Sequence, residues 1–339
     1  MTGRSEARAG TAKSARRDTE EASDGRGRER SPLPVDVLLA GYLAVTGALA
    51  LGSLTPVGAA LAAAHGVGIW LLLGPVAGLG PGAPVRDALA GGSVSPEATR
   101  PAPPPIHLAR FVRVAYPVLL TPLLYTELEL LNQFYVQGYL DATVQGWEEA
   151  LFGAQLSVVW AERQPWRWLS ELMHLGYFSY YLLIPISAVV VYRRGGQAEL
   201  HRFTMVTGLA FFLCYVAFVV FPVTGPRYLY DQLQGTPARA FLFDAVHAVA
   251  EGGSSKGTAF PSSHVAATVA AWLACRRVAR RWYWTAAPFV LLLTLGTVYG
   301  RFHYAVDALS GVFVALAAWK LAPALTGRVS PGDRGRSRD

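Results

Sequence analysis

Charged residues are scarce in this chain of 339 residues, at 16%, whereas hydrophobic residues make up 52% and the mean hydropathy is +0.30. A coiled coil or an ordinary soluble domain carries more charge than this. The two cysteines, Cys214 and Cys275, lie inside apolar runs and exclude a disulfide framework. The 34 glycines follow no triplet period, which excludes a collagen-like helix. Most of the chain is therefore expected to lie in lipid.

Apolar windows of about the length needed to cross a bilayer core recur along the chain. They lie at 33–54, 57–80, 112–131, 173–192, 203–222, 262–279, 284–300 and 304–323. We therefore predict an all-α, polytopic integral membrane protein with about eight transmembrane helices.

Composition divides the chain into five parts. Residues 1–31 carry many charges of both signs and almost nothing apolar, which predicts a disordered tail. Residues 32–80 hold two N-terminal transmembrane helices, and 81–110, rich in Pro, Gly and Ala, is expected to be a flexible linker. A six-helix core follows at 111–323, and 324–339 is expected to be a second disordered tail.

Lysine and arginine are retained on the cytoplasmic side of a membrane during insertion. With the N-terminus inside, that side holds 24 of the 30 basic residues. The other side keeps six: Arg163, Arg167, Arg227, Arg239, Lys256 and Arg301. We therefore predict a multi-pass protein of the cell membrane with both termini cytoplasmic. Because no basic face forms on a soluble domain, no nucleic-acid partner is expected.

The segment 133–170 mixes four tryptophans with acidic residues and contains no apolar window long enough to cross. Indole rings favour the membrane interface, so one or two amphipathic helices are expected to lie at the outer surface. An ordinary loop with aromatic anchors is the alternative.

Three short motifs fall on the side that is poor in basic residues. They are Gly225-Pro226-Arg227-Tyr228, then Lys256 followed by Phe260-Pro261-Ser262-Ser263-His264, and finally Tyr299-Gly300-Arg301-Phe302-His303-Tyr304-Ala305-Val306-Asp307. Half of the six outer basic residues lie in or beside these motifs, so they are candidates for a shared site.

The third motif carries a geometric prediction. If Asp307 lies in the first turn of the last helix, His303 stands one turn before it and the carboxylate reaches the imidazole. A carboxylate on one ring nitrogen fixes the tautomer and leaves the other nitrogen free to attack or to accept a proton. The alternative is a buried polar pair that joins two helices.

The second motif is typical of a helix start, since proline and serine favour the first turn and the cap. Unpaired backbone N–H groups at such a start attract anions, and His264 would lie beside them. A lone interfacial histidine is often only structural, but here a second histidine and several cations share its side of the membrane.

Two histidines, a carboxylate and several cations suit phosphoryl transfer, which needs a nucleophile, an acid for the leaving oxygen and fixed positive charge. Two His and one Asp are also a metal-ligand set. The chain lacks an H-E-x-x-H pair and a set of thiolates, and the nearby Arg and Lys would repel a cation. No metal is therefore expected at the site.

The motifs resemble those of the type 2 phosphatidic acid phosphatase superfamily, membrane enzymes with a six-helix core. The family pattern runs K-x6-R-P, then P-S-G-H, then S-R-x5-H-x3-D, and the resemblance covers about 111–323. It implies a lipid-phosphate phosphatase or phosphotransferase and adds no organic cofactor.

The resemblance also implies a role for each motif residue. His303 would be the nucleophile that forms a phosphohistidine, and Asp307 would orient it. His264 would be the general acid for the leaving group. Arg227 and Arg301 would hold the phosphate.

The chain departs from the family pattern at three places. Ser263 replaces the glycine of P-S-G-H and adds a hydroxyl that would contact phosphate. Thr297 replaces an arginine, and Arg301, one helical turn later, is expected to serve the same face. No lysine stands seven residues before Arg227, and Lys256 is the candidate for the missing cation. These departures are similar to the branch that includes inositol phosphorylceramide synthases.

Two classes of function remain. The first is a phosphatase or phosphotransferase that acts on a lipid phosphate or phospholipid at the extracytoplasmic face, with water or an alcohol such as inositol as acceptor. The second is a transporter or binding scaffold that holds an anionic lipid without turnover, with Glu127 and Glu129 near the end of a span as a proton path. Their position at the outer end of that span favours an interfacial cap instead.

Overall fold

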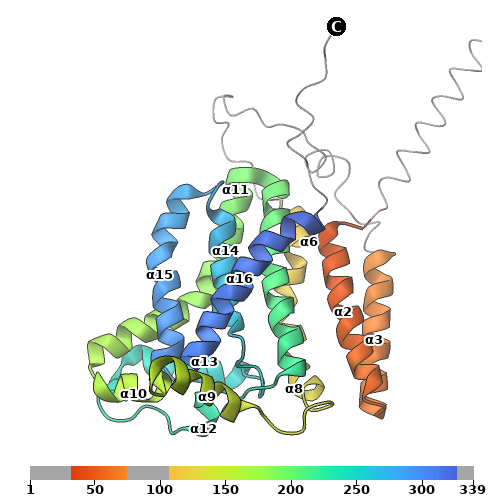
Figure 1. The fold of residues 1–339 in the computed structure, drawn as a ribbon. Coiled ribbons are helices and arrows are strands. Elements are labelled where there is room, and N and C mark those ends of the chain that lie inside the picture. The colour runs from red at the N-terminus through yellow and green to blue at the C-terminus, as the bar shows by residue number, and fades with distance from the viewer. Residues whose placement is uncertain (1–31, 75–106, 327–339) are drawn as a thin grey trace, which may run out of the picture.

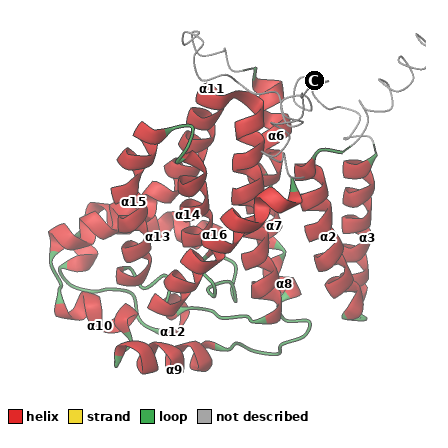
Figure 2. Cartoon of the chain, turned by 45° about the horizontal axis from the view of Figure 1, so that its top comes forward, coloured by secondary structure: helices red, strands yellow, loops and turns green. Residues whose placement is uncertain are grey.

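The computed structural model describes residues 32–74 and 107–326, and these ranges are built from helices without a strand (Figure 1). Loops join the helices (Figure 2), and two loops pair at a single bridge in this part of the chain, between Val223 and Thr258. The predicted all-α fold is therefore confirmed. The predicted tail 1–31, most of the predicted linker 81–110 and residues 327–339 of the second predicted tail lie outside the described residues, whereas 324–325 belong to the last helix.

Five helices of the described ranges are long and apolar enough to cross a membrane. They are α2 (Pro34–Gly52), α3 (Pro56–Leu73), α6 with α7 (Leu108–Leu119 and Thr121–Thr126), α11 (Arg167–Val220) and α16 (Ala305–Leu325). By length and composition, they are what a polytopic membrane protein requires.

The 54-residue helix α11 contains two of the predicted spans. Its helical geometry breaks at Gly196, where φ is 70°, a conformation that glycine adopts readily. The chain turns back there, so the predicted spans 173–192 and 203–222 run in opposite directions from this turn (Figure 1).

The two remaining spans correspond to α14 (Ser263–Cys275) and α15 (Arg280–Tyr299). Each of the eight predicted apolar windows therefore overlaps at least one helix of the described residues, although 75–80 of the second window lie outside them and the third window is divided among three helices. Because its 13 residues extend only about 20 Å, α14 is shorter than its neighbours α15 and α16.

Short helices gather at the end of the bundle opposite to the turn in α11 (Figure 1). They are α8 (Leu128–Leu131), α9 (Asp141–Phe152), α10 (Leu156–Arg163), α12 (Pro226–Leu229), the 3-10 turn η1 (Pro237–Arg239) and α13 (Phe241–Gly253). The segment 133–170 thus forms two short helices, α9 and α10. Trp147 of α9 stacks on Phe221, with 5.6 Å between ring centroids, which ties this helix to the end of α11.

Helix α11 is the centre of the bundle and packs against α6, α14, α15 and α16. Its contact with α15 depends on a small residue, because a Cβ on Gly296 would collide with the carbonyl oxygen of Met173. Small residues let helix backbones approach closely in membranes, where packing drives association.

A buried ion pair joins α2 to the rest of the fold. Both guanidinium nitrogens of Arg113 on α6 donate to the two carboxylate oxygens of Asp36, at 2.7 and 2.6 Å. The Tyr116 hydroxyl donates to the same carboxylate at 2.7 Å. Asp36 is fully buried, so these donors replace the water that the charge has lost.

A second polar contact joins α3 to the segment between α7 and α8. The Glu127 carboxylate lies 3.0 Å from Nε2 of His65, and it accepts from the Tyr42 hydroxyl at 3.5 Å. Nδ1 of His65 lies 3.1 Å from the Thr46 hydroxyl. Glu127, predicted to be an interfacial cap, therefore connects the N-terminal pair of helices to the core.

Replacing Asp36 by Asn should lower the thermal unfolding temperature of the purified protein in detergent. The Arg113 charge would then face a neutral amide, and losing one partner of a buried ion pair typically costs about 3 to 5 kcal/mol. Glu199→Gln is the matched control, because its pair with Arg202 is partly exposed and such pairs contribute about 1 kcal/mol or less. Equal unfolding temperatures for the two variants would contradict this role of Asp36.

Candidate active site

The second motif forms the start of α14, as predicted. Ser262 is the N-cap residue, and its hydroxyl accepts from the Val265 N–H at 3.4 Å. His264 is the second residue of the helix. The first N–H groups of a helix have no acceptor within it, so the backbone around Ser263 and His264 offers donors to an anion.

The third motif forms the start of α16. Asp307 lies in the first turn and accepts from the Tyr304 N–H at 2.8 Å, which caps the helix. The same carboxylate oxygen lies 3.4 Å from Nδ1 of His303, close to the ring but short of a well-aligned hydrogen bond. Asp307 is fully buried. The spacing of four residues thus has the geometric consequence predicted from the sequence.

The two helix starts are tied to each other. The Ser262 N–H donates to the backbone carbonyl of Asp307 at 3.0 Å. Gly311, one turn further along α16, permits this approach, because a Cβ there would lie 2.6 Å from the Ser262 carbonyl oxygen. As a result, Nε2 of His303 lies 3.5 Å from Nδ1 of His264. The structure therefore brings both predicted histidines and Asp307 into one cluster.

The electrostatic setting of His303 favours a neutral ring. Burial lowers its pKa to about 4, and a hydrogen bond with the backbone of Ala259 opposes this only in part. A neutral imidazole that faces a carboxylate with Nδ1 carries its proton there and has a lone pair on Nε2. In that tautomer the lone pair of Nε2 faces Nδ1 of His264.

Two tyrosines of α11 complete the surroundings of His264, and the motifs gave no indication of them. The Tyr177 hydroxyl lies 3.4 Å from Nε2 of His264, and the ring of Tyr180 lies 4.6 Å from the imidazole, centroid to centroid. Their i, i+3 spacing places both on one face of the helix. This spacing is the sequence signal that would have indicated that the two tyrosines face the same site.

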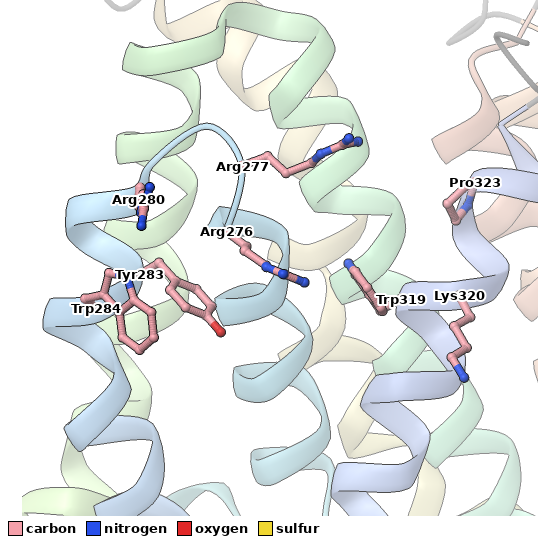
Figure 3. A pocket seen from close by; sticks show the side chains of 8 residues that line it. All are labelled: Arg276, Arg277, Arg280, Tyr283, Trp284, Trp319, Lys320 and Pro323. Atoms are coloured by element: carbon pink, nitrogen blue, oxygen red, sulfur yellow. The ribbon is translucent and has the colours of Figure 1, made fainter. Parts of the chain in front are cut away.

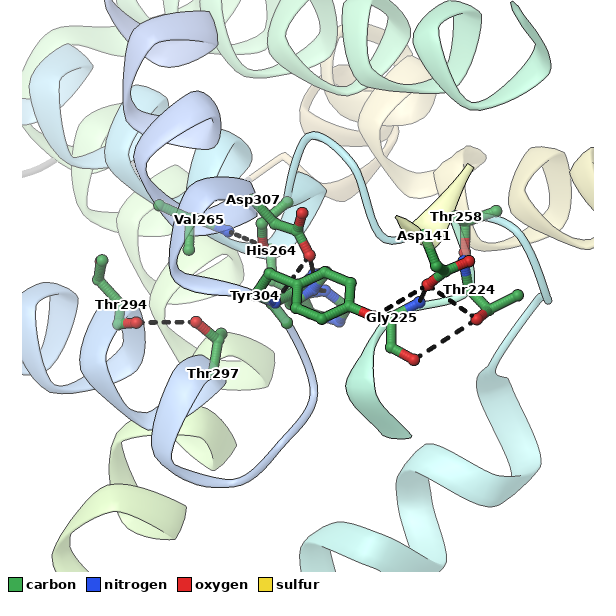
Figure 4. A network of polar contacts seen from close by, with 12 residues as sticks. Asp141, Thr224, Gly225, Thr258, His264, Val265, Thr294, Thr297, Tyr304 and Asp307 are labelled. Carbon is green, nitrogen blue, oxygen red and sulfur yellow. Dashed lines mark hydrogen bonds and ion pairs between the residues drawn. The ribbon is translucent and has the colours of Figure 1, made fainter. Parts of the chain in front are cut away.

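Asp141, at the start of α9, is the polar centre of the loops around the cluster (Figure 4). Its carboxylate accepts from the Thr224 N–H at 2.9 Å, from the Thr224 hydroxyl at 3.0 Å and from the Gly225 N–H at 2.9 Å. It also accepts from the Tyr304 hydroxyl at 3.2 Å. The first and third motifs are therefore held on one carboxylate, a role that the sequence did not indicate.

The first and second motifs meet in the bridge between Val223 and Thr258. The Ala259 N–H donates to the Val223 carbonyl at 2.8 Å. This contact places Arg227, in α12, at the same end of the bundle as His264. Burial lowers the pKa of His247 to about 4, and the charges of His174 and, to a smaller extent, Arg227 add to this effect. Arg227 forms no ion pair with the described residues and is half-buried.

Arg301 has a position that the sequence did not predict. It lies beyond the end of α15 with a positive φ of 60°, so it does not share a helical face with Thr297. Its guanidinium donates to the carbonyls of Asp231 and Val158, at 2.6 and 3.2 Å, and to the Glu162 carboxylate at 2.7 Å. Only Nε is buried without a hydrogen-bond partner. Arg301 therefore holds α10 and the loop after α12 against the site.

The other two predicted phosphate ligands differ in position. Ser263 is buried in the first turn of α14, next to His264. The Lys256 ammonium lies over the ring of Tyr139 at 5.1 Å and that of Tyr228 at 5.9 Å. The described contacts of its side chain are thus with aromatic rings, and no contact joins it to either histidine.

Side chains that bind metals do not gather in groups of three or more anywhere in residues 32–74 and 107–326. The chemistry that these groups can perform without one is nucleophilic attack by a neutral imidazole, proton transfer by a second imidazole and binding of an anion.

A family model described as the PAP2 superfamily matches residues 143–321. The match runs from α9 to α16 and contains all three motifs and the tyrosines of α11. Neither the comparison with curated proteins nor that with solved structures gives a match for this chain.

Replacing Asp141 by Asn should reduce turnover and lower the unfolding temperature together. The amide nitrogen would point hydrogens at donors of Thr224 and Gly225, leaving buried N–H groups unpaired at about 1 to 3 kcal/mol each. Glu149→Gln, on the exposed side of the same helix, is the control and should leave both quantities unchanged. Wild-type activity and stability in Asp141→Asn would contradict the role of Asp141 as the common anchor.

Proposed function

Since this chain belongs to the PAP2 superfamily, we propose that it removes or transfers the phosphoryl group of a membrane lipid phosphate through a phosphohistidine on His303. The observation that carries the proposal is the 3.5 Å separation of Nε2 of His303 from Nδ1 of His264, with Asp307 behind the first ring. Phosphoryl transfer depends mainly on positioning and fixed charge, and both are available here.

In the first step, Nε2 of His303 attacks phosphorus and the bond from phosphorus to the lipid oxygen breaks. His264 enters this step as an imidazolium, and the proton on its Nδ1 passes to the departing oxygen, so a neutral lipid alcohol leaves and a neutral imidazole remains. The phosphorylated ring of His303 becomes cationic, and the Asp307 carboxylate, 3.4 Å from Nδ1, stabilises that charge. The Tyr177 oxygen, 3.4 Å from Nε2 of His264, orients the acid.

In the second step, His264 accepts a proton from the incoming hydroxyl while the oxygen attacks phosphorus. The bond between nitrogen and phosphorus breaks, and His303 returns to its neutral state. The hydroxyl belongs to water in a phosphatase and to an alcohol such as inositol in a phosphotransferase. The same groups serve both reactions, which makes transfer the alternative within one mechanism.

Fixed positive charge around the histidines stabilises the oxygens of the transferring group. The Arg227 guanidinium makes no ion pair within 32–74 and 107–326, Arg301 offers Nε, and the first turn of α14 offers backbone N–H groups and the Ser263 hydroxyl. One such donor typically contributes about 3 to 4 kcal/mol to transition-state stabilisation. Lys256 would attract the substrate from the rim of the site.

The substrate class is a lipid because the histidines lie at helix starts of a membrane bundle. A phosphate head would reach the cluster from the end where α9, α10 and α13 lie, while the acyl chain stays in the bilayer. The distribution of Lys and Arg places this end outside the cytoplasm in the proposal. A non-catalytic lipid transporter or scaffold is the competing function.

Purified protein in detergent should release phosphate from a lipid phosphate, or exchange its headgroup, and His303→Ala should abolish this turnover. The reaction should resist EDTA and be blocked by vanadate, which mimics a phosphoryl group in transfer. Phosphate release or headgroup exchange is measured against phosphatidic acid, polyprenyl phosphates and phospholipid plus inositol.

The matched control is His201→Ala, which removes another buried imidazole, one that makes no side-chain hydrogen bond. It should retain turnover per folded molecule. If the wild type shows no turnover and specific lipid binding persists in His303→Ala, the result would support the scaffold and contradict the enzymatic function.

Replacing His264 by Ala should slow substrates with poor leaving groups most. An alkyl lipid phosphate needs a proton on its departing oxygen, whereas an aryl phosphate such as p-nitrophenyl phosphate does not. We expect a loss of about 100-fold or more for the lipid, within the range of general acid catalysis, and a much smaller loss for the aryl ester. Equal losses for both substrates would remove His264 from the role of general acid.

A further inference from the structure

A hollow of about 1080 Å³ lies among the ends of three helices (Figure 3). Its walls come from the C-terminal end of α14, the start of α15 and the last turns of α16. The lining residues are Arg276, Arg277, Arg280, Tyr283, Trp284, Trp319, Lys320 and Pro323. Because α14 runs from His264 to this hollow, about 20 Å of helix separates the two places.

Four cations and no carboxylate line the hollow. Among the described residues, none of the four has an ion pair or a side-chain hydrogen bond. Cations on the cytoplasmic side of a membrane protein are common, but here they converge from three helices on one concavity. All four are exposed to solvent, so the hollow presents a positive charge that an anionic ligand would meet directly.

The start of α15 adds to this excess of positive charge. A helix N-terminus carries the positive end of the helix dipole and usually has an acidic or capping side chain. In α15 the N-cap residue, Ala279, provides no side-chain cap and the first turn holds no acid. Arg280 stands there instead. The uncapped N–H groups and the arginines therefore favour the same kind of ligand, an anion.

The aromatic side chains around the hollow are of the kind that favours the level of lipid headgroups. Trp284 is 63% exposed, and Trp319 lies across the hollow on α16. Tyr283 stacks on Trp272, with 4.4 Å between ring centroids, and forms a firm wall. Indole rings concentrate where the acyl region meets the headgroups, so a ligand there has one polar end and one apolar end.

We propose that this hollow binds the headgroup of an anionic phospholipid from the leaflet opposite to the histidine cluster. Basic hollows between transmembrane helices suit phosphate headgroups. The volume exceeds what a single phosphate fills, and four cations match the two phosphodiesters of a lipid such as cardiolipin. Binding at this place does not depend on the proposed reaction, because no residue of the hollow belongs to the catalytic cluster.

The test measures lipid-induced thermal stabilisation of the full chain in a non-ionic detergent. Cardiolipin should raise the unfolding temperature at low concentration, while phosphatidylcholine and inorganic phosphate should not. In R276Q/R280Q the cardiolipin concentration that gives half of the maximal rise in unfolding temperature should increase about ten-fold or more. Each basic residue near a membrane surface contributes about a factor of five to the affinity for anionic lipid. The shift should persist in His303→Ala, which separates this site from the proposed reaction.

The matched control is R193Q/R194Q, which removes two exposed arginines from the same end of the bundle but outside the hollow. It should respond to cardiolipin as the wild type does. Equal weakening in both double variants would show a diffuse surface charge and overturn the proposal. A response to inorganic phosphate equal to that to cardiolipin would also overturn it, because it would make the ligand a soluble anion.

Discussion

The hydrogen bond from the Ser262 N–H to the Asp307 carbonyl is the contact on which the candidate site depends. It joins the starts of α14 and α16, which are separated in the chain by the whole of α15. His264 lies in the first turn of α14 and His303 lies just before α16. This junction therefore sets the distance of 3.5 Å between Nε2 of His303 and Nδ1 of His264. A backbone contact of this kind varies little with side-chain motion, which suits a reaction that depends on positioning.

The loops around the junction have little regular structure and are held by a few buried side chains. Asp141 fixes the loop before α12 and the cap of α16, and Arg301 fixes α10 and the loop after α12. Each uses one side chain to satisfy several backbone groups that would otherwise be buried without partners. The segment 133–170 is therefore part of the support of the site.

Local patterns in the sequence predicted the parts of the structure that depend on local physics. The apolar windows located the helices, Pro261-Ser262-Ser263 located the start of α14, and the spacing of His303 and Asp307 predicted their contact. These features depend on helix length, capping and helical periodicity, all of which act over a few residues.

The remaining features depend on contacts between distant residues. Asp141 meets Tyr304 across 163 positions, and Tyr177 meets His264 across 87, so no local pattern reports them. Arg301 was expected on the face of Thr297, but α15 ends before it and the positive φ turns its side chain toward α10. Helical spacing applies only while the helix continues, and the apolar pattern of the sequence did not show where α15 ends.

The most direct measurement is a rapid quench in alkali of purified protein during turnover of a ³²P-labelled lipid phosphate. Phosphohistidine survives alkali and is lost in acid, so digestion and mass spectrometry can locate the label. The account predicts an alkali-stable, acid-labile phosphoryl group on the peptide that contains His303. Label on His264, or turnover without any covalent label, would contradict it.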